Sequence, residues 1–234
     1  MCAASNLEIL DYCDTPLGVL CLRRRELLAE PGTVVTEVTI NHEFLMSSYN
    51  TDSEVALARL AMGWHGGKEL DVLVGGLGLG YTAHAALENK AVTNVEVLEL
   101  LPEVISWFTR DLVPLASSLT ADPRFRAVEG DIFERLAQAP RKTYDAILID
   151  VDHNPEELLD QKNAAFYTPK GLSAARAHLN AGGVLAIWSS AENDAFARTL
   201  DKVFSEIKIE AVHWRNELLE DEEEQRDDLF MARD

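Results

Sequence analysis

The feature that most constrains the fold of this chain is an alternation between short apolar runs and helix-like segments from residue 70 to residue 205. Apolar runs with the length of buried strands occur at 70–75, 94–99, 125–129, 144–149 and 184–188. The segments that predict helices lie at 79–89, from Pro102 onward, at 131–138, at 169–180 and at 193–205. This alternation is typical of a parallel sheet that carries helices on both faces.

Two further apolar runs follow the last predicted helix, near 207–214 and 228–232. Because a loop joins them and no helix intervenes, we expect them to form an antiparallel hairpin at one edge of the sheet. The loop contains the acidic segment ELLEDEEE (217–224), which we interpret as a solvated loop. The expected sheet therefore has seven strands, most of them parallel.

The N-terminal part of the chain carries a different pattern. Two runs predict strands, PLGVLCL (16–22) and TVVTEVTI (33–40). Pro31-Gly32 marks a turn between them, and a helix capped by Asp52 or Ser53 is expected to follow. We predict a small β-hairpin element in residues 1–50 and a Rossmann-like α/β domain in residues 51–234.

Composition narrows the classes of function. The chain has 234 residues with 40 acidic and 21 basic side chains, a formal net charge of −19. A nucleic-acid partner is not expected, because phosphate binding needs a basic face, whereas an acidic surface attracts cationic substrates. We find no apolar run long enough to span a membrane and no signal peptide. Three cysteines without a C-x-x-C pair indicate a reducing cytoplasm.

A glycine-rich loop follows the first strand of the alternating region, in VLVGGLGLGYTAH (72–84). Its glycines allow φ > 0 and let backbone N–H groups approach a ligand near an electropositive helix N-terminus. The dinucleotide pattern G-x-G-x-x-G is not met, because Tyr81 stands where the third glycine is required. The loop therefore indicates a nucleotide-like ligand other than NAD, bound by Gly75, Gly76, Gly78 and Gly80.

Acidic residues stand at the carboxyl ends of the next strands, where open α/β sheets bind their ligands. Glu99 ends the second strand and suits both hydroxyls of a ribose, although a solvated carboxylate also fits there. Gly130-Asp131 ends the third strand, and its carboxylate suits an exocyclic amine or a helix N-cap. Because no Gly-Lys-Ser/Thr motif is present, these residues together favour an adenosine pocket, and a nucleoside with a sulfonium fits it best.

The fourth predicted strand leads into DVDHNP (150–155). Together with the glycine loop, Glu99 and Gly130-Asp131, this segment resembles the spermidine synthase family, the polyamine aminopropyltransferases. The family's loop G-G-G-D-G-G corresponds to GGLGLG (75–80), its Glu-Ile-Asp to Glu99-Leu100-Leu101, and its Gly-Asp to Gly130-Asp131. Its catalytic D-x-x-D-P loop is matched in part by 150–155, and AFYT (165–168) resembles the aromatic segment that follows. The resemblance covers about residues 70–190 and implies the class I S-adenosylmethionine-dependent methyltransferase fold.

The resemblance also implies a reaction. An aminopropyl group would move from decarboxylated S-adenosylmethionine to a small cationic di- or polyamine, with Asp150 as the proton acceptor. Asp152, His153 and Tyr81 would lie near the amine, and the glycines, Glu99 and Asp131 would hold the nucleoside. No metal ion is implied, and a homodimer is the expected assembly.

Two positions depart from the family pattern. Gly78 stands where the family's loop has an aspartate that contacts the aminopropyl amine, and His153 stands where its catalytic loop has a second aspartate. Two alternatives therefore stay open: an S-adenosylmethionine-dependent methyltransferase acting on a small amine or oxygen nucleophile, and a non-catalytic protein that binds a nucleoside or a polyamine. The stretch HEFLMSSY (42–49) is a candidate segment for covering the site.

Overall fold

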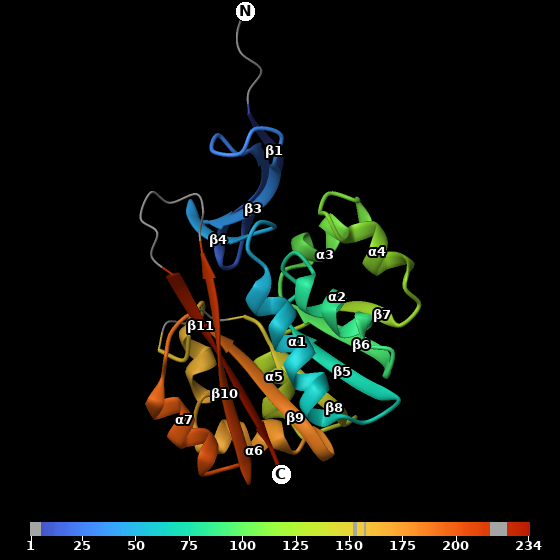
Figure 1. Ribbon diagram of the computed structural model, residues 1–234, viewed down its shortest axis with the longest axis vertical. Coiled ribbons are helices and arrows are strands. Elements are labelled where there is room, and N and C mark those ends of the chain that lie inside the picture. Colours follow the sequence, from blue (N-terminus) through green and yellow to red (C-terminus); the bar gives the residue numbers. More distant parts are fainter. Residues whose placement is uncertain (1–5, 152–153, 157, 216–223) are drawn as a thin grey trace, which may run out of the picture.

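The computed structural model describes residues 6–151, 154–156, 158–215 and 224–234, and these form two β-sheets (Figure 1). The smaller sheet is built from the N-terminal part of the chain and lies over one end of the larger sheet, at the top of the view in Figure 1. The larger sheet and its helices make up the rest of the described chain. A site between the two sheets can therefore take residues from both.

The N-terminal sheet has four antiparallel strands in the order β1-β2-β3-β4. They are β1 (Leu7–Thr15), β2 (Gly18–Glu26), β3 (Val34–Ile40) and β4 (Glu43–Ser47). The sequence predicted the two central strands, which bury apolar side chains, and missed the two outer ones. Neither outer strand has a fully buried residue, so neither carries the apolar alternation that reveals a half-buried strand.

The larger sheet has seven strands in the order β10-β11-β9-β8-β5-β6-β7. β5 to β9 run parallel, whereas β11 pairs antiparallel with both β9 and β10. This confirms the predicted fold class, including the antiparallel hairpin at one edge. The strands span β5 (Leu70–Gly75), β6 (Val92–Glu99), β7 (Phe125–Glu129), β8 (Tyr144–Ile149), β9 (Leu179–Ser189), β10 (Glu206–Arg215) and β11 (Glu224–Arg233).

Helices cover both faces of the larger sheet. Successive residues of β5 point to opposite faces, so Val72 and Val74 join one apolar cluster and Leu73 joins the other. Residues of α1 to α4 complete the first cluster, and residues of α5 to α7 complete the second. The helices are α1 (Asp52–His65), α2 (Tyr81–Glu88), α3 (Pro102–Thr109), α4 (Ala116–Ala121), α5 (Ile132–Ala137), α6 (Pro169–Arg176), α7 (Asp194–Asp201) and the 3-10 helix η1 (Gln161–Ala165).

Some boundaries differ from the sequence-based expectation for local reasons. α6 ends at Arg176 because His178 turns inward, where its ring Nε2 lies 3.0 Å from the carbonyl oxygen of Gln138. β9 begins directly afterwards and includes the two glycines that were expected to end the helix. At α1 the expected cap was wrong: Thr51 is the N-cap residue, and Ser53 makes a tertiary contact instead.

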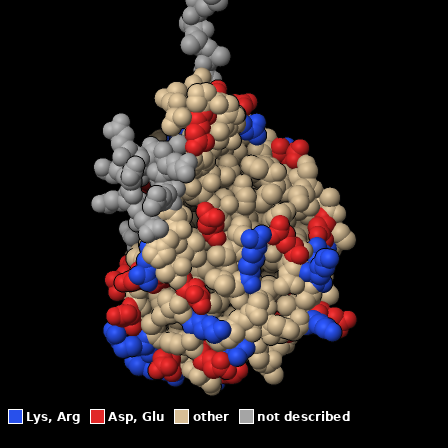
Figure 2. Space-filling model, viewed as in Figure 1, with Lys and Arg blue, Asp and Glu red and all other residues tan. Residues whose placement is uncertain are grey.

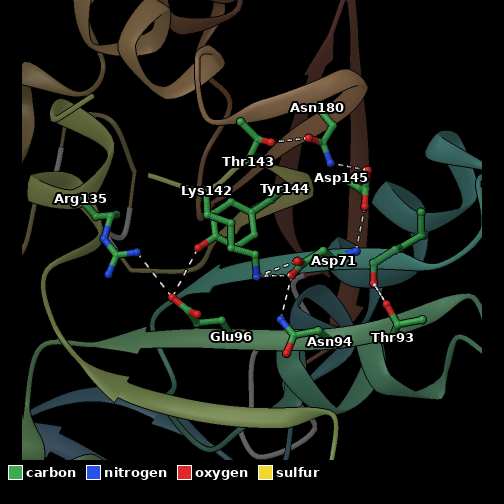
Figure 3. A network of polar contacts seen from close by, with 11 residues as sticks. Asp71, Thr93, Asn94, Glu96, Arg135, Lys142, Thr143, Tyr144, Asp145 and Asn180 are labelled. Atoms are coloured by element: carbon green, nitrogen blue, oxygen red, sulfur yellow. Dashed lines mark hydrogen bonds and ion pairs between the residues drawn. The ribbon is translucent and has the colours of Figure 1, made fainter. Parts of the chain in front are cut away.

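The amino ends of the parallel strands are joined by a polar network that Figure 3 shows. Lys142 Nζ lies 2.6 Å from Asp71 Oδ2, and Asn94 Nδ2 donates to Asp71 Oδ1 at 2.8 Å. Asp145 accepts hydrogen bonds from the Asp71 N–H and from the side chain of Asn180, at 2.8 Å each. Because these groups satisfy one another at the end of the sheet opposite the glycine loop, they stabilise the alignment of β5, β6, β8 and β9.

The face of the molecule in Figure 2 carries acidic and basic side chains that are interspersed, and its lysine and arginine residues form no continuous patch. In the described part of the chain, no helix has the length and apolar character needed to cross a membrane.

Candidate active site

A cavity of about 670 Å³ lies between the N-terminal sheet and the carboxyl ends of the parallel strands. The larger sheet contributes the loops that follow β5, β6, β7 and β8, and the N-terminal sheet contributes side chains of β2, β3 and β4. Phe44, Met46 and Tyr49 from the stretch 42–49 are among the lining residues. The segment that was a candidate to cover the site therefore forms part of the cavity wall.

The glycine loop after β5 follows a path that side chains would obstruct. Gly76 has a φ of 91°, and a Cβ there would lie 2.2 Å from the carbonyl oxygen of Asp150. Gly78 has a φ of 50°, and a Cβ there would lie 2.9 Å from Sδ of Met46. Gly76, Gly78 and Gly80 line the cavity, whereas Gly75 is the last residue of β5 and is not among the lining residues. Three of the four predicted glycines thus bring their backbone to the cavity.

Glu99, at the end of β6, is buried and only 8% exposed. Its Oε2 accepts a hydrogen bond from the Leu77 N–H at 2.9 Å, and its Oε1 accepts one from the Leu101 N–H at 2.8 Å. Burial raises the pKa of the carboxyl, and the backbone N–H groups around it oppose that shift. Glu99 is therefore not a solvated strand end; it attaches the glycine loop to β6 within the cavity wall.

The two carboxylate oxygens of Asp131 make different contacts. Oδ1 caps α5 by accepting hydrogen bonds from the N–H groups of Phe133 at 2.8 Å and Glu134 at 3.2 Å, so the N-cap interpretation is confirmed. Oδ2 lies 3.1 Å from Nζ of Lys162, which also lines the cavity. The hydrogen bond to Asp131 raises the pKa of Lys162. One carboxylate oxygen therefore has a structural contact and the other faces the cavity.

Asp150, the residue after β8, lies beside the glycine loop. Its backbone N–H donates to the carbonyl oxygen of Gly75 at 3.0 Å, and its Oδ2 accepts a hydrogen bond from Thr82 Oγ1 at 2.6 Å. Burial raises the pKa of Asp150 to about 6; the Thr82 hydroxyl opposes this shift and Asp227 adds to it. A carboxyl group that ionises near neutral pH is suited to general-base catalysis.

Glu54 and Asp227, for which no role was predicted, line the same cavity. Glu54 lies in the first turn of α1, and burial raises its pKa to about 8, with Asp150 and Asp227 adding to the shift. Asp227, on β11, is 7% exposed. Its Oδ2 accepts hydrogen bonds from the hydroxyl of Ser53 and from the indole N–H of Trp214. Glu54, Asp150 and Asp227 thus bring acidic groups to the cavity from three separate elements.

A weak signal for Asp227 was present in the sequence. The run DDLFMA (227–232) places two aspartates at the start of an apolar strand, where buried acidic side chains need partners. Asp228 has a cationic partner, since it pairs with Arg226 at 2.9 Å, whereas Asp227 has none among the described residues. For Glu54 and Lys162 the sequence held no signal, because both reach the cavity only through tertiary packing.

Four other residues were predicted to belong to the site, and the structure describes two of them. Tyr81 and Gly130 line the cavity, and burial raises the pKa of the Tyr81 hydroxyl, with Glu54 adding to the shift. Asp152 and His153 lie outside the described residues, so their place near an amine stays a prediction. Within the described ranges, no three His, Cys, Asp or Glu side chains are grouped so that they would hold a metal ion.

Comparison with known sequences finds one relative of known activity. The chain matches no protein-family model. Over 98 residues, 41% of its length, it is 36% identical to polyamine aminopropyltransferase 2 of Streptomyces coelicolor. That match spans 17% of the relative, which is a much longer protein.

The fold is found in solved structures, among them the following two. A spermidine synthase in complex with the transition state analogue AdoDATO has a TM-score of 0.72 at 17% identity, over 96% of this chain and 73% of that one. Human methyltransferase-like protein 13 in complex with SAH has a TM-score of 0.50 at 18% identity, over 77% of this chain and 78% of that one. The chain therefore has the class I methyltransferase-like fold of the spermidine synthases and is related in sequence to a polyamine aminopropyltransferase.

Proposed function

We propose that the protein is an aminopropyltransferase that uses decarboxylated S-adenosylmethionine and a small di- or polyamine. The observation that carries the proposal is the position of Glu99, Asp131 and Asp150 around one cavity beside the glycine loop. Two similarities support the same reaction: the relative in sequence is named a polyamine aminopropyltransferase, and the chain shares the fold of a spermidine synthase.

In this proposal the nucleoside lies against the glycine loop. The backbone at Gly76 and Gly78 is accessible from the cavity. Glu99 lines the cavity beside the loop, and in this proposal its carboxylate accepts hydrogen bonds from the ribose hydroxyls. Oδ2 of Asp131, now beside Lys162, is placed to accept from the exocyclic amine of adenine. The cavity therefore offers a contact for each polar part of an adenosine.

The charge of the cavity favours the decarboxylated donor over S-adenosylmethionine. Carboxyl groups around the reaction centre attract the ammonium group of an aminopropyl tail and repel the carboxylate that S-adenosylmethionine carries. Two arginines also line the cavity, but Arg23 and Arg25 both pair with the buried Glu37, at 2.8 Å and 2.7 Å. Because Glu37 already pairs with both arginines, they are not available to bind the carboxylate of S-adenosylmethionine.

Asp150 is the base in the proposed mechanism. It takes a proton from the ammonium group of the acceptor, and the lone pair that is set free attacks the carbon next to the sulfonium. The new C–N bond forms while the C–S bond breaks, and its electron pair stays on sulfur, so that 5′-methylthioadenosine leaves. Because the sulfonium is already a good leaving group, positioning supplies much of the rate.

The reaction is tested by giving purified protein both sulfonium donors together with a panel of di- and polyamines. Mass spectrometry should detect 5′-methylthioadenosine and an amine that has gained an aminopropyl group. Release of S-adenosylhomocysteine would instead identify a methyltransferase. Binding of a donor without either product would identify a non-catalytic binding protein.

The role of Asp150 is tested by Asp150→Asn. We expect kcat to fall roughly 10²- to 10⁴-fold, because the amide cannot accept the proton. Nucleoside affinity should stay nearly unchanged, since the amide oxygen keeps the hydrogen bond from Thr82. Glu134→Gln is the matched control, because that exposed side chain at the start of α5 lies outside the cavity. Full turnover in Asp150→Asn would remove Asp150 from the mechanism.

The proposal also includes the oligomeric state of the protein and its cellular compartment. The protein would act as a homodimer, as the family resemblance implies, and light scattering on purified protein measures that state. It would act in the cytoplasm, as its cysteine content indicates.

A further inference from the structure

Glu54, Asp150 and Asp227 form a group of carboxyls that the reaction described above uses only in part. They come from α1, from the end of β8 and from β11, and all three line the cavity. The hydroxyl of Ser53, the residue before Glu54, donates to Asp227 and so joins α1 to β11 at this point. Elements that are distant in sequence therefore place acidic groups around one part of the cavity.

This group lacks a positive countercharge within the part of the chain that the structure describes. Two other buried acidic side chains have one: Asp228 pairs with Arg226, and Glu37 pairs with two arginines. The hydrogen bonds to Asp150 and Asp227 come instead from neutral donors, two hydroxyls and one indole. Buried carboxylates without a cation are costly, and a cationic ligand would relieve that cost.

Aromatic side chains accompany these carboxyls. Tyr81, Trp188 and Trp214 line the same cavity. Aromatic faces beside carboxylates suit an alkylammonium ion, because its methylenes pack on the rings and its charge is attracted to them.

The glycine loop adds no acidic side chain to this region. Gly78 faces β4, where Met46 occupies the space that a side chain on the loop would need, since a Cβ at Gly78 would lie 2.9 Å from its Sδ. The negative charge near the reaction centre therefore comes from α1, β8 and β11 rather than from the loop.

We propose that Glu54 and Asp227 bind the distal ammonium group of the acceptor while its reacting nitrogen faces Asp150. This assignment rests on the proposed function and names its acceptor class. Glu54 and Asp227 add carboxyls to the one that Asp150 supplies, which matches a linear diamine or polyamine, whereas a monoamine of the same length leaves the added carboxyls without a cation. Glu54 and Asp227 are thus specificity-determining residues for the second substrate.

Binding of a diamine should release a proton from the protein. Glu54 keeps its proton up to about pH 8 in the empty cavity, because burial and the neighbouring Asp150, Asp227 and Asp52 all raise its pKa. Tyr81 is the other titratable group that faces it. An ammonium ion beside Glu54 favours the ionised form. We expect about one proton to leave near neutral pH.

Isothermal titration calorimetry with putrescine, a linear diamine, in two buffers of different ionisation enthalpy measures affinity and proton release together. Glu54→Gln should bind about tenfold more weakly and release no proton, and Asp227→Asn should bind about tenfold to a hundredfold more weakly. Glu134→Gln, the exposed control on α5, should behave as the wild type. Wild-type affinity and proton release in both cavity variants would overturn the assignment. If Asp227→Asn does not fold, Glu54→Gln alone decides.

Transfer assays on the same variants separate this assignment from the proposed function. We expect the KM for the amine to rise about tenfold while the KM for the donor stays nearly constant. If the wild type binds putrescine with proton release but transfers nothing, the amine site stands and the proposed function fails. If the wild type transfers and both variants keep its KM for the amine, the function stands and the assignment fails.

Discussion

Burial raises the pKa values of the Glu54 and Asp150 side chains. Each is an ordinary carboxyl group in the sequence, yet the pKa of Glu54 is raised to about 8 and that of Asp150 to about 6. The largest cause in both is removal from water. Acidic neighbours raise both pKa values further, while the Thr82 hydroxyl lowers that of Asp150. Both groups therefore titrate in the range where an amine substrate and a base must exchange a proton.

Glu54→Gln is expected to flatten the pH dependence of stability. The pKa of Glu54 is about 8 in the folded protein and 4.5 when unshifted, so its stabilising contribution is fully present below about pH 4.5 and is lost as the pH rises to about 8. Between about pH 5 and pH 9, the wild type should lose roughly 1–3 kcal/mol more unfolding free energy than the variant. Chemical denaturation at the two pH values measures this, and equal losses would contradict it.

Thr82→Val is expected to move the acid limb of the pH–rate profile upward. The hydroxyl of Thr82 lowers the pKa of Asp150 from the value that burial alone would produce, and wild-type kcat/KM should therefore decline below about pH 6. Valine keeps the shape and removes the donor. Thr82→Ser keeps the donor and serves as the control. An acid limb that is identical in all three proteins would exclude Asp150 as the titrating base.

At the scale of the element, the glycine loop connects three strand ends. The N–H of Gly76 donates to the carbonyl oxygen of Leu98 at 2.9 Å, and the carbonyl oxygen of Gly75 accepts from the N–H of Asp150 at 3.0 Å. The loop thus aligns the ends of β5, β6 and β8. Any change in its path would move the candidate ribose-binding and base residues together.

Gly76→Ala should destabilise the protein by about 2–4 kcal/mol, because its Cβ would overlap the Asp150 carbonyl and because φ is 91°. Gly63→Ala is the matched control in α1. A Cβ at Gly63 meets nothing within 4 Å, so alanine there should stabilise the helix by about 0.5–1 kcal/mol. Chemical denaturation compares the two, and effects of the same sign would contradict the loop geometry.

At the scale of the whole molecule, the cavity exists only because the two sheets are held together. Asp11 of β1 joins them: its Oδ2 accepts from the indole N–H of Trp107 on α3 at 2.8 Å and from Arg110, the C-cap residue of α3, at 2.9 Å. Arg24 of β2 adds a weaker contact to the carbonyl oxygen of Leu112 at 3.4 Å. The N-terminal sheet is therefore positioned by contacts with the α3 region, on the right of Figure 1.

Asp11→Ala should lower the free energy of unfolding by roughly 1–3 kcal/mol, since the buried indole N–H of Trp107 loses its acceptor. Affinity for 5′-methylthioadenosine should fall as well, because β2, β3 and β4 form part of the cavity wall. Glu8→Ala is the control on the same strand, where the exposed carboxylate lies 3.9 Å from Arg24. Denaturation and calorimetry measure the two effects; nucleoside affinity equal to wild type would show that the sheet does not contribute to that site.

Much of the larger sheet was predictable because its signals are local. The apolar runs at β5 and β8 are buried on both faces, and their observed bounds match the prediction. Short or exposed elements such as β1, β4 and α4 were missed, because they lack apolar periodicity. The turn at His178 was missed for a different reason, since a buried contact with Gln138 ends that helix.

The sequence by itself determined which residues stand at the carboxyl ends of the parallel strands. Glu99 is the last residue of β6, Asp131 lies two residues after β7, Asp150 follows β8 directly, and parallel strands bring such ends to one edge. Only the tertiary structure decided that Glu54 and Asp227 join Asp150. They approach one another because α1 packs on the sheet next to the antiparallel strand β11, and such long-range packing leaves no periodic trace in the residues around either one.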